Sequence, residues 1–591
     1  MIGWFRLQRL RNALSEDQFT GPIYFGLWVP AMCSSLGWAL SDMADAVVVG
    51  QRIGTVGLAA IALILPVYMI NCMFAHGLGL GGSVRFARLK SEGKEAEAKE
   101  CFAQVFWLTM ALSVGTAVLG TLFLTPLLAA LGTVPGDGAL FEATRDYLRI
   151  LVLATPLFYL CNVLNYFLRN DGSQKIAGVG SVVGNLCDIT LNIVLVLGLN
   201  MGTQGAALST ALGQVITLLF YAPGLLGKGK LLHIRFPGRG WLHPAFFALV
   251  SGLGTSVQYL YQMIFFLVCN NVLIRLGGET GVAVFDVIQN SSYLILYLYE
   301  GTARAMQPVL TTYHGEHNLD GLRRTSALGF GSGVAVGSLL IALIAVWPRS
   351  MCLLFGIAGS AAEPMAAFAL RVYVLGAFFA GLNILLCNYY QSFGISQAAF
   401  VLETLRGGVL LLPLTVICAQ FGLYGFWWLF PLTEIGSLAV FLLLRKMGRY
   451  QVPITDAQRV FQRTILSTNQ DVGTVSQDLE GFCERWEATM RQQFAVTNAV
   501  EEVGLTILKH GFHGRTDGYI QVTVIALEDG DFEVHLRDNA VTFNPFLLET
   551  ERATSAEDVD FDALGILMLK KRAKEFFYHR YQGFNTMIIH L

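Results

Sequence analysis

Residues Thr109–Leu131 read TMALSVGTAVLGTLFLTPLLAAL and contain no charged side chain. About 20 apolar residues are enough to cross the hydrocarbon core of a bilayer as a helix. Similar, mainly apolar stretches, such as Val334–Leu354 and Gly425–Leu443, follow one another up to about residue 450. Only 14% of the 591 residues are charged, whereas soluble domains have about 25%. The sequence therefore predicts a polytopic α-helical membrane protein.

By length and hydropathy, about twelve helices are expected to span the membrane before residue 450. Their approximate extents are 22–50, 57–84, 102–131, 145–168, 175–199, 203–227, 242–275, 281–312, 325–356, 364–390, 397–419 and 423–445. Basic connections alternate with short or acidic ones, and basic connections tend to stay in the cytoplasm. We therefore expect a multi-pass protein of the plasma (inner) membrane with both termini in the cytoplasm.

The membrane region repeats itself. Gly57-Leu-Ala-Ala matches Gly281-Val-Ala-Val, and Gly202-x-x-Gly205 matches Gly422-x-x-Gly425. Two six-helix repeats in the same orientation follow, because six spans return the chain to its starting side. Paired halves are typical of transporters, whose substrate path runs between them. The predicted units are a cytoplasmic N-terminal segment (1–20), repeat one (21–227), a cytoplasmic linker (228–241), repeat two (242–449) and a cytoplasmic domain (450–591).

Carboxyl groups inside the apolar half are candidate functional residues, because each costs at least ~2.5–3.5 kcal/mol to insert. Asp42 and Asp45 lie three residues apart on one face of the first span. Asp188 lies in the middle of the fifth span, with Asn192 four residues later. Such a carboxyl can take up a cation on one side of the membrane and release it on the other. The alternative is that these groups only hydrogen-bond neighbouring helices.

Two further buried carboxyls fit a structural role better. Glu300 lies in the eighth predicted span and Glu434 in the twelfth. Arg304 and Arg406 are the expected partners of these two groups.

Several motifs of residues 15–447 resemble those of multidrug and toxic compound extrusion (MATE) transporters. They are Asp45-Ala-Val-Val-Val-Gly50-Gln, Leu168-Arg-Asn-Asp-Gly172 and Met306-Gln-Pro308. The resemblance implies that an aspartate in the first span and an Asn-x-x-x-Asp pair in the fifth bind the coupling cation. Asp45 matches the first position. In the fifth span the two residue types are exchanged: Asp188 stands where the family has Asn, and Asn192 where it has Asp. A spacing of four keeps both on one helix face.

Residues 450–591 have the charge density of a soluble domain and predict a two-layer α+β fold. The expected elements are a long helical region at Val475–Gly511, strands at Tyr519–Leu527 and Asp531–Arg537, a helix near Leu564–Phe577 and a last strand near Asn585–His590.

This tail resembles the ATP-binding domain of anti-sigma-factor-like kinases, which is of the histidine-kinase type. Glu502, Thr506 and His510 match the E-x-x-x-N-x-x-x-H box of that family, at a spacing of four. Asp538 and Phe543 match the D-x-G-x-x-F-x-P box, and Leu564 and Gly565 match the lid motif G-G-L-G-I. The resemblance implies that Asp538 receives the adenine amino group.

Three positions depart from that pattern. Thr506 replaces the Mg²⁺-binding Asn, Ala540 replaces a Gly, and Asp562-Ala563 replace the paired lid glycines. Thr506 would be a weak metal ligand, because a hydroxyl binds a metal less well than an amide oxygen. The tail therefore has a possible site for ATP and Mg²⁺, with kinase or ATPase activity weakened.

The main expectation is a secondary transporter that exports an organic, cationic or amphipathic solute while protons or sodium ions enter. Such a transporter is not an enzyme and needs no cofactor for transport. Two alternatives are a membrane-anchored regulatory protein acting through its tail on a cytoplasmic protein partner, and a flippase for lipid-linked substrates. ATP-powered pumping is disfavoured, because no G-x-x-x-x-G-K-[ST] stretch occurs. A net charge of −2 gives no reason to expect nucleic-acid binding.

Overall fold

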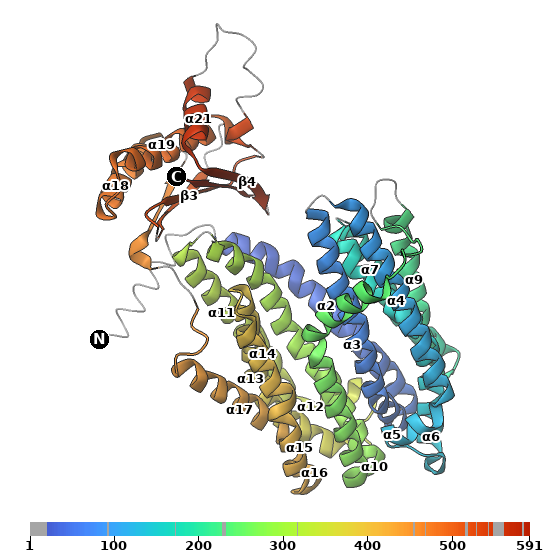
Figure 1. Ribbon diagram of the computed structural model, residues 1–591. Coiled ribbons are helices and arrows are strands. Elements are labelled where there is room, and N and C mark those ends of the chain that lie inside the picture. The colour runs from blue at the N-terminus through green and yellow to red at the C-terminus, as the bar shows by residue number, and fades with distance from the viewer. Residues whose placement is uncertain are drawn as a thin grey trace, which may run out of the picture.

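The computed structural model describes residues 20–591 except 92–93, 172, 227–231, 316, 453–455, 467–468, 514–517, 528, 542, 548–560 and 582–583. Nearly all of the predicted N-terminal segment and the start of the predicted linker therefore lie outside the described residues. The rest forms a large helical body and a small domain with one sheet (Figure 1).

The first repeat is built from six long helical segments. They are α2 (Thr20–Ile53), α3 (Thr55–Ser91), α4 (Glu95–Leu122) with α5 (Leu124–Leu131), α6 (Ala139–Leu153) with α7 (Thr155–Asn170), α8 (Gln174–Asn192) with the π-helical η2 (Ile193–Gly198), and α9 (Gly202–Leu226). The bend of 51° between α6 and α7 falls at Ala154. Pro156 follows in the first turn of α7, where a missing backbone N–H costs no helical hydrogen bond.

The second repeat begins with α10 (Leu242–Gly315), which folds back on itself at Gly278. The backbone there has φ 59° and ψ −151°, a conformation that glycine adopts readily. The rings of Phe265 and Phe285 lie 6.0 Å apart, so the two arms are antiparallel. The two spans expected at 242–275 and 281–312 are thus arms of one hairpin. The later helices are α11 (Leu319–Val346), α12 (Pro348–Leu354), α13 (Glu363–Ser392), α14 (Ser396–Thr404) with the π-helical η3 (Leu405–Val409) and α15 (Leu411–Ala419), then α16 (Gly422–Phe426) and α17 (Leu429–Lys446).

Among the described residues, nine helices are long and apolar enough to span a membrane, or ten if the bent pair α6–α7 is one span. The second arm of α10 adds one more, and the 34-residue α2 another. Counted in this way, the described part of the chain agrees with the predicted twelve spans.

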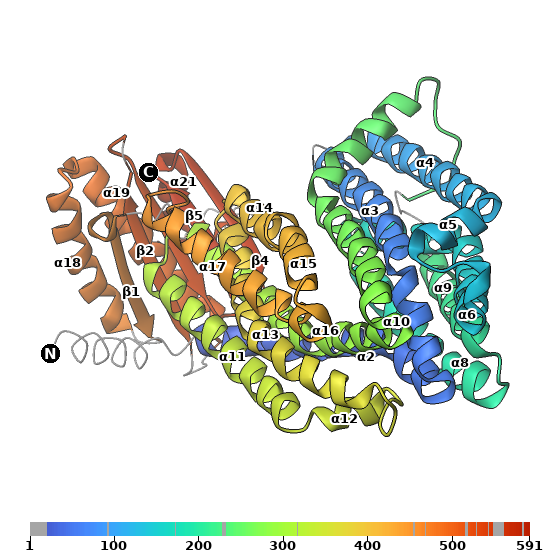
Figure 2. The ribbon, with the colours of Figure 1, turned by 90° about the horizontal axis from the view of Figure 1, so that it is seen from below.

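The N-terminal part of the first helix of each repeat packs against the other repeat. In α2, the Tyr24 hydroxyl lies 2.6 Å from Ser332 Oγ of α11, and Trp28 donates to Thr302 of α10 at 3.1 Å. In the first arm of α10, a Cβ at Gly252 would lie 2.0 Å from the carbonyl oxygen of Gly77 on α3. Figures 1 and 2 show the resulting crossover, with α2 reaching under α11 and the start of α10 reaching α3 and α4.

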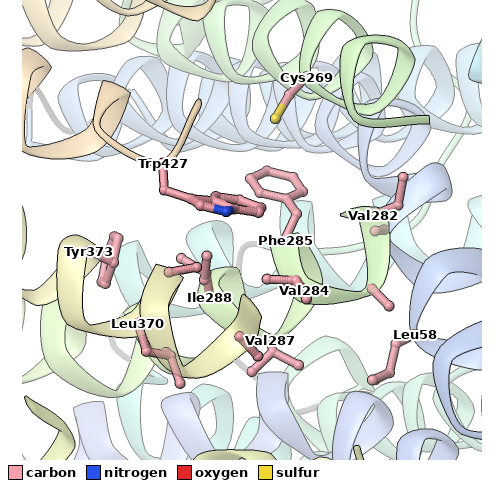
Figure 3. Packing of buried hydrophobic residues seen from close by; sticks show 14 of the residues in the cluster. Leu58, Cys269, Val282, Val284, Phe285, Val287, Ile288, Leu370, Tyr373 and Trp427 are labelled. Carbon is pink, nitrogen blue, oxygen red and sulfur yellow. The ribbon is translucent and has the colours of Figure 1, made fainter. Parts of the chain in front are cut away.

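At the end opposite the tail, the repeats are held together by side-chain hydrogen bonds. Gln51 donates to the carbonyl oxygens of Leu353 (2.6 Å) and Leu354 (2.8 Å), and Thr55 donates to Glu279 at 2.5 Å. The largest buried apolar cluster also joins the repeats. Figure 3 shows part of this cluster, in which Leu58 comes from α3 and Val282, Phe285, Val287 and Ile288 come from α10.

The tail is the predicted two-layer domain. Its strands are β1 (Val460–Leu466), β2 (Tyr519–Ala526), β3 (Phe532–Asp538), β4 (Glu575–Tyr581) and β5 (Phe584–His590), which form an antiparallel sheet in the order β1-β2-β3-β5-β4. The helices α18 (Asn469–Arg485), α19 (Met490–Thr506) and α21 (Phe561–Arg572) lie on the sheet face away from the membrane helices (Figure 1).

Three expectations for the tail are wrong in detail. The helical region Val475–Gly511 is two helices, because the chain turns between them, where Glu487 has φ 54°. The helix expected at Leu564–Phe577 ends at Arg572, and its last residues belong to β4. Strand β1 was not expected. Both missed strands lie at sheet edges, where polar and apolar residues alternate too weakly to mark a strand.

Candidate functional site

Asp45 of α2 is the centre of a polar site inside the first repeat. Its Oδ2 accepts hydrogen bonds from the Tyr147 hydroxyl of α6 (3.2 Å) and from Thr210 Oγ1 of α9 (3.3 Å). Its Oδ1 accepts a hydrogen bond from the side-chain amide of Asn192, the last residue of α8. Three helices distant in sequence thus converge on one carboxyl group.

The two candidate residues of the fifth span interact with this carboxyl group in different ways. Asn192 is fully buried and bonds Asp45 directly. Asp188, one turn earlier, interacts with Asp45 electrostatically. The exchange of the two residue types therefore puts the amide next to Asp45 and the second carboxyl further away. Asp42 lies one turn before Asp45 on α2, and its side chain is outside the described residues.

Local backbone features allow this convergence. A Cβ at Gly213 of α9 would lie 2.9 Å from the Cβ of Asp188, so the glycine lets α9 approach α8 at this level. Directly after Asn192 the helix widens into the π-helical turn η2. Such turns are frequent at functional sites.

All three hydrogen-bond donors to Asp45 are neutral groups, and its recorded electrostatic partner is another carboxyl. Hydroxyl and amide donors can orient a carboxylate but cannot neutralise it. In an apolar surrounding, the charge needs a bound proton or cation. The arrangement can therefore bind and release a small cation.

The sequence alone does not identify Tyr147 and Thr210 as members of the site. Tyr147 is 102 positions from Asp45 and Thr210 is 165 positions away. A single tyrosine or threonine in a span gives no signal by itself, because both are common in helices that only pack. Only the fold identifies them.

Glu300 and Glu434 have the expected structural partners. Glu300 pairs with Arg304 at 3.3 Å. Glu434 is held by Arg406 through two hydrogen bonds of 2.8 and 3.0 Å and is also bonded by Asn383 at 2.7 Å. Because their charges are paired, these two groups are not free to bind a cation.

In the tail, the acidic residue of the adenine box is already engaged. Asp538 is fully buried, and its Oδ1 accepts the backbone N–H of Ala540 (2.8 Å) and the side-chain amide of Asn585 (2.7 Å). The Asn585 amide thus already bonds the carboxylate that the resemblance assigns to the adenine amino group. The Asn585 side chain is itself fixed by the Tyr578 hydroxyl at 2.9 Å.

The remaining tail candidates lie around the end of α19. Thr506 is 2% exposed, which leaves its hydroxyl little access to a metal. The Glu502 carboxylate lies against Gly565 of α21, where an added Cβ would be 1.9 Å from Oε2. His510 stacks on Phe543 with ring centroids 6.1 Å apart. The side chain of Leu564 is outside the described residues.

These residues do not fit Mg²⁺-ATP as the resemblance implies. The metal position is a buried hydroxyl, and the adenine aspartate already has an amide partner. In the described part of the chain, no group of three or more His, Cys, Asp or Glu residues could hold a metal ion.

The open face of the tail sheet contacts the last turn of α10 and the loop that follows it. The Arg537 guanidinium of β3 lies 5.2 Å from the ring centre of Tyr313 and 5.1 Å from that of Phe584. Burial, together with the nearby His535, lowers the pKa of His317 in this loop. The contact thus includes an aromatic anchor and a titratable group.

The histidines of this contact also act on Glu533 of β3. Burial alone would raise the pKa of Glu533, but the hydrogen bond from His535 and the charges of His535, His590 and His317 lower it overall. The tail and the membrane region are therefore linked electrostatically.

Two family models match the chain. The MatE model matches residues 30–194 and 255–417, which is more than half of the chain, and the histidine kinase-like ATPase domain model matches residues 465–590. The Multidrug export protein MepA of Staphylococcus saprophyticus is 24% identical over 436 residues, covering 72% of this chain and 93% of that protein. The MepA of Staphylococcus haemolyticus is 25% identical over 449 residues, covering 73% of this chain and 95% of that protein.

Solved structures agree with these matches. A multidrug resistance MATE family transporter in an inward-facing conformation is 26% identical, with a TM-score of 0.63, and the alignment covers 69% of this chain and 94% of that one. An outward-facing structure, at 24% identity, has a TM-score of 0.57, covers 74% and 97% of the two chains, and supports the fold alone.

Proposed function

The chain belongs to the MatE family of membrane transporters, and from that premise we propose that it is an antiporter that exports organic, cationic or amphipathic solutes in exchange for protons or sodium ions. The observation that carries this proposal is the buried Asp45, held by neutral donors from three helices. Transport of this kind uses the ion gradient and needs no cofactor.

The Asp45 site can couple ion entry to export through alternating access. When the site opens to the outside, the carboxyl takes up a proton or sodium ion and loses its affinity for a cationic solute. When it opens to the cytoplasm, the ion leaves and the negative charge again favours the solute. Asn192, Tyr147 and Thr210 would hold the carboxyl in place through both states, and Asp188 would share the charge.

We further propose that the described conformation is open towards the cytoplasm, with both termini on that side. The hydrogen bonds of Gln51 and Thr55 close the repeats at the end opposite the tail. The similarity to an inward-facing relative, with a TM-score of 0.63, supports the same orientation.

Replacing Asp45 with Asn tests the coupling. An amide keeps the size of the side chain but cannot take up a proton or balance a cation. In everted membrane vesicles energised by a proton or a sodium gradient, we expect the variant to accumulate no ethidium, whereas wild type accumulates it. Asp320→Asn, an exposed carboxyl in the first turn of α11, is the matched control and keeps wild-type uptake. Unchanged uptake by Asp45→Asn would remove Asp45 from the mechanism.

The contact of the tail with Tyr313 at the end of α10 favours a second, regulatory role. A domain docked on one repeat can hold that repeat in one state or receive a cytoplasmic protein partner. In this proposal the tail tunes transport and does not drive it. Full-length protein incubated with a photoreactive ATP analogue and Mg²⁺ tests the nucleotide question directly. If the analogue labels the tail and excess ATP prevents that labelling, nucleotide binding is part of the mechanism.

A further inference from the structure

Asp286, in the second arm of α10, is a buried carboxyl that the site around Asp45 does not use. Its side chain is 1% exposed, and both carboxylate oxygens are buried without a hydrogen-bond partner in the described part of the chain. The Asn290 side chain, one turn later, donates instead to the backbone carbonyl of Asp286. Burying a carboxyl group in this way costs free energy. No structural role of Asp286 in the second repeat explains that cost.

The surroundings of Asp286 are apolar and lie between the repeats. Its neighbours in sequence, Phe285 and Val287, belong to the large cluster that also contains Leu58 of α3 (Figure 3). Between Thr55 and His76, α3 brings no acidic or basic side chain to this interface. A sodium ion needs several oxygen ligands arranged around it, whereas a proton needs only the carboxylate itself.

The first arm of the α10 hairpin carries a second buried polar side chain with an unsatisfied atom. Asn270 and Asp286 are each eight residues from the turn at Gly278, on antiparallel arms. The Asn270 amide nitrogen donates to the carbonyl oxygen of Ala62 at 2.8 Å, and its Oδ1 is buried without a partner in the described part of the chain. Among the described residues, unsatisfied polar atoms thus occur on both arms of the α10 hairpin.

Asp286 is also linked to the first site. Tyr147, which donates to Asp45, interacts electrostatically with Asp45, Asp188 and Asp286. The titratable groups that act on Tyr147 therefore come from both repeats: Asp45 on α2 and Asp188 on α8 in the first, and Asp286 on α10 in the second.

We propose that Asp286 is a second proton-binding carboxyl of the transport cycle, whose occupancy is coupled to that of Asp45 through Tyr147. In the closed state, the proton on Asp286 removes a charge that the apolar interface cannot hold. When the repeats separate and water or a cationic solute reaches Asp286, the proton leaves to solvent and the carboxylate remains. This inference rests on the proposed antiport and assigns to it a second proton site, outside the first repeat.

The test measures protons released when a cationic probe binds. Purified full-length protein in lipid nanodiscs is mixed with tetraphenylphosphonium in weakly buffered solution, and a pH-indicator dye reports the release. We expect Asp286→Asn to release about half as many protons per bound probe as wild type, Asp286→Glu to release nearly as many as wild type, and Asp320→Asn to be unchanged. The double variant Asp45→Asn/Asp286→Asn should release none.

The outcomes separate this inference from the proposed function. Full release by Asp286→Asn, with reduced release by Asp45→Asn, overturns the role of Asp286 and leaves the antiport intact. Full release by Asp45→Asn, or none by wild type, overturns the proton-coupled antiport and the inference with it.

A melting curve of the same variants identifies a purely structural role. Because the Asp286 carboxylate makes no hydrogen bond, Asp286→Leu should melt at the same or a higher temperature than wild type. A large drop in melting temperature for both Asp286→Leu and Asp286→Asn would mean that the carboxyl holds the fold together, and would overturn the proposal.

Discussion

The hydrogen bonds that close the repeats opposite the tail give a quantitative prediction about conformation. In the variant Gln51→Ala/Thr55→Val, the described state loses two bonds to the carbonyl oxygens of Leu353 and Leu354 and one bond to Glu279. Because Gln51 and both leucines are exposed, water replaces the first two bonds, and their loss costs about 1 kcal/mol together. The bond to the Glu279 carboxylate is partly buried and contributes roughly 1.5–3 kcal/mol.

Together these losses disfavour the described state by about 3 kcal/mol. Since 1.4 kcal/mol is a factor of ten, the ratio of this state to its alternative should fall by roughly 150-fold. We expect the repeats to separate at that end and to approach each other on the tail side. Pulsed electron paramagnetic resonance between spin labels at Glu97 on α4 and Lys446 on α17, both exposed, measures the change as a shorter distance.

The labels should be introduced as spin-labelled noncanonical residues, which spares the ten free cysteines. Ser350→Ala is the matched control, because Ser350 bonds only the carbonyl oxygen of Trp347 within its own turn. An unchanged distance distribution in the double variant would refute the reasoning that these bonds hold the described state.

Three further predictions concern the ion pair, the tail contact and the tail itself. Arg406→Met should destabilise the protein by about 3–5 kcal/mol, because it leaves Glu434 buried without its arginine partner. The double variant Arg406→Met/Glu434→Leu should recover most of that stability in thermal unfolding. Equal losses of stability in the two variants would contradict this prediction. The lowered pKa of His317 means that the docked tail binds fewer protons than a released one, so docking should be complete above about pH 6.5 and weaken as the pH falls below that value. Hydrogen exchange of the backbone amides around Tyr313 measures how completely the tail is docked. His317→Gln should remove the pH dependence of docking. A pH dependence that persists in this variant would mean that another group binds the proton. Truncation after Arg449 should leave basal efflux measurable, and complete loss with normal membrane insertion would instead favour a protein that works through its tail.

Much of the fold could be predicted because hydrocarbon imposes simple rules on sequence. Long apolar stretches mark the spans, and the glycine motifs at offsets near 220 mark the repeats. What the sequence could not give is contact between distant positions. Tyr147 and Thr210 meet Asp45 only because α6 and α9 converge on α2, and no local pattern encodes that meeting.

Asp286 was missed for a different reason. It follows Gly281-Val-Ala-Val-Phe285, a run that reads as packing, and it has no acidic neighbour one turn away on α10. Its significance comes from its surroundings: in the described part of the chain, both carboxylate oxygens are buried without a hydrogen-bond partner. In the tail, by contrast, the motif residues could be assigned from the sequence, but the amide of Asn585 on Asp538 required the register of β3 and β5, in which these two residues are direct neighbours.

The exchange of first helices between the repeats has a consequence for how the protein assembles. Tyr24 and Trp28 of α2 complete the surface of the second repeat, while Gly252 of α10 fits into a notch on α3. Neither half therefore finishes its own surface, and a nascent first half leaving the ribosome holds an unfilled groove until the start of α10 arrives.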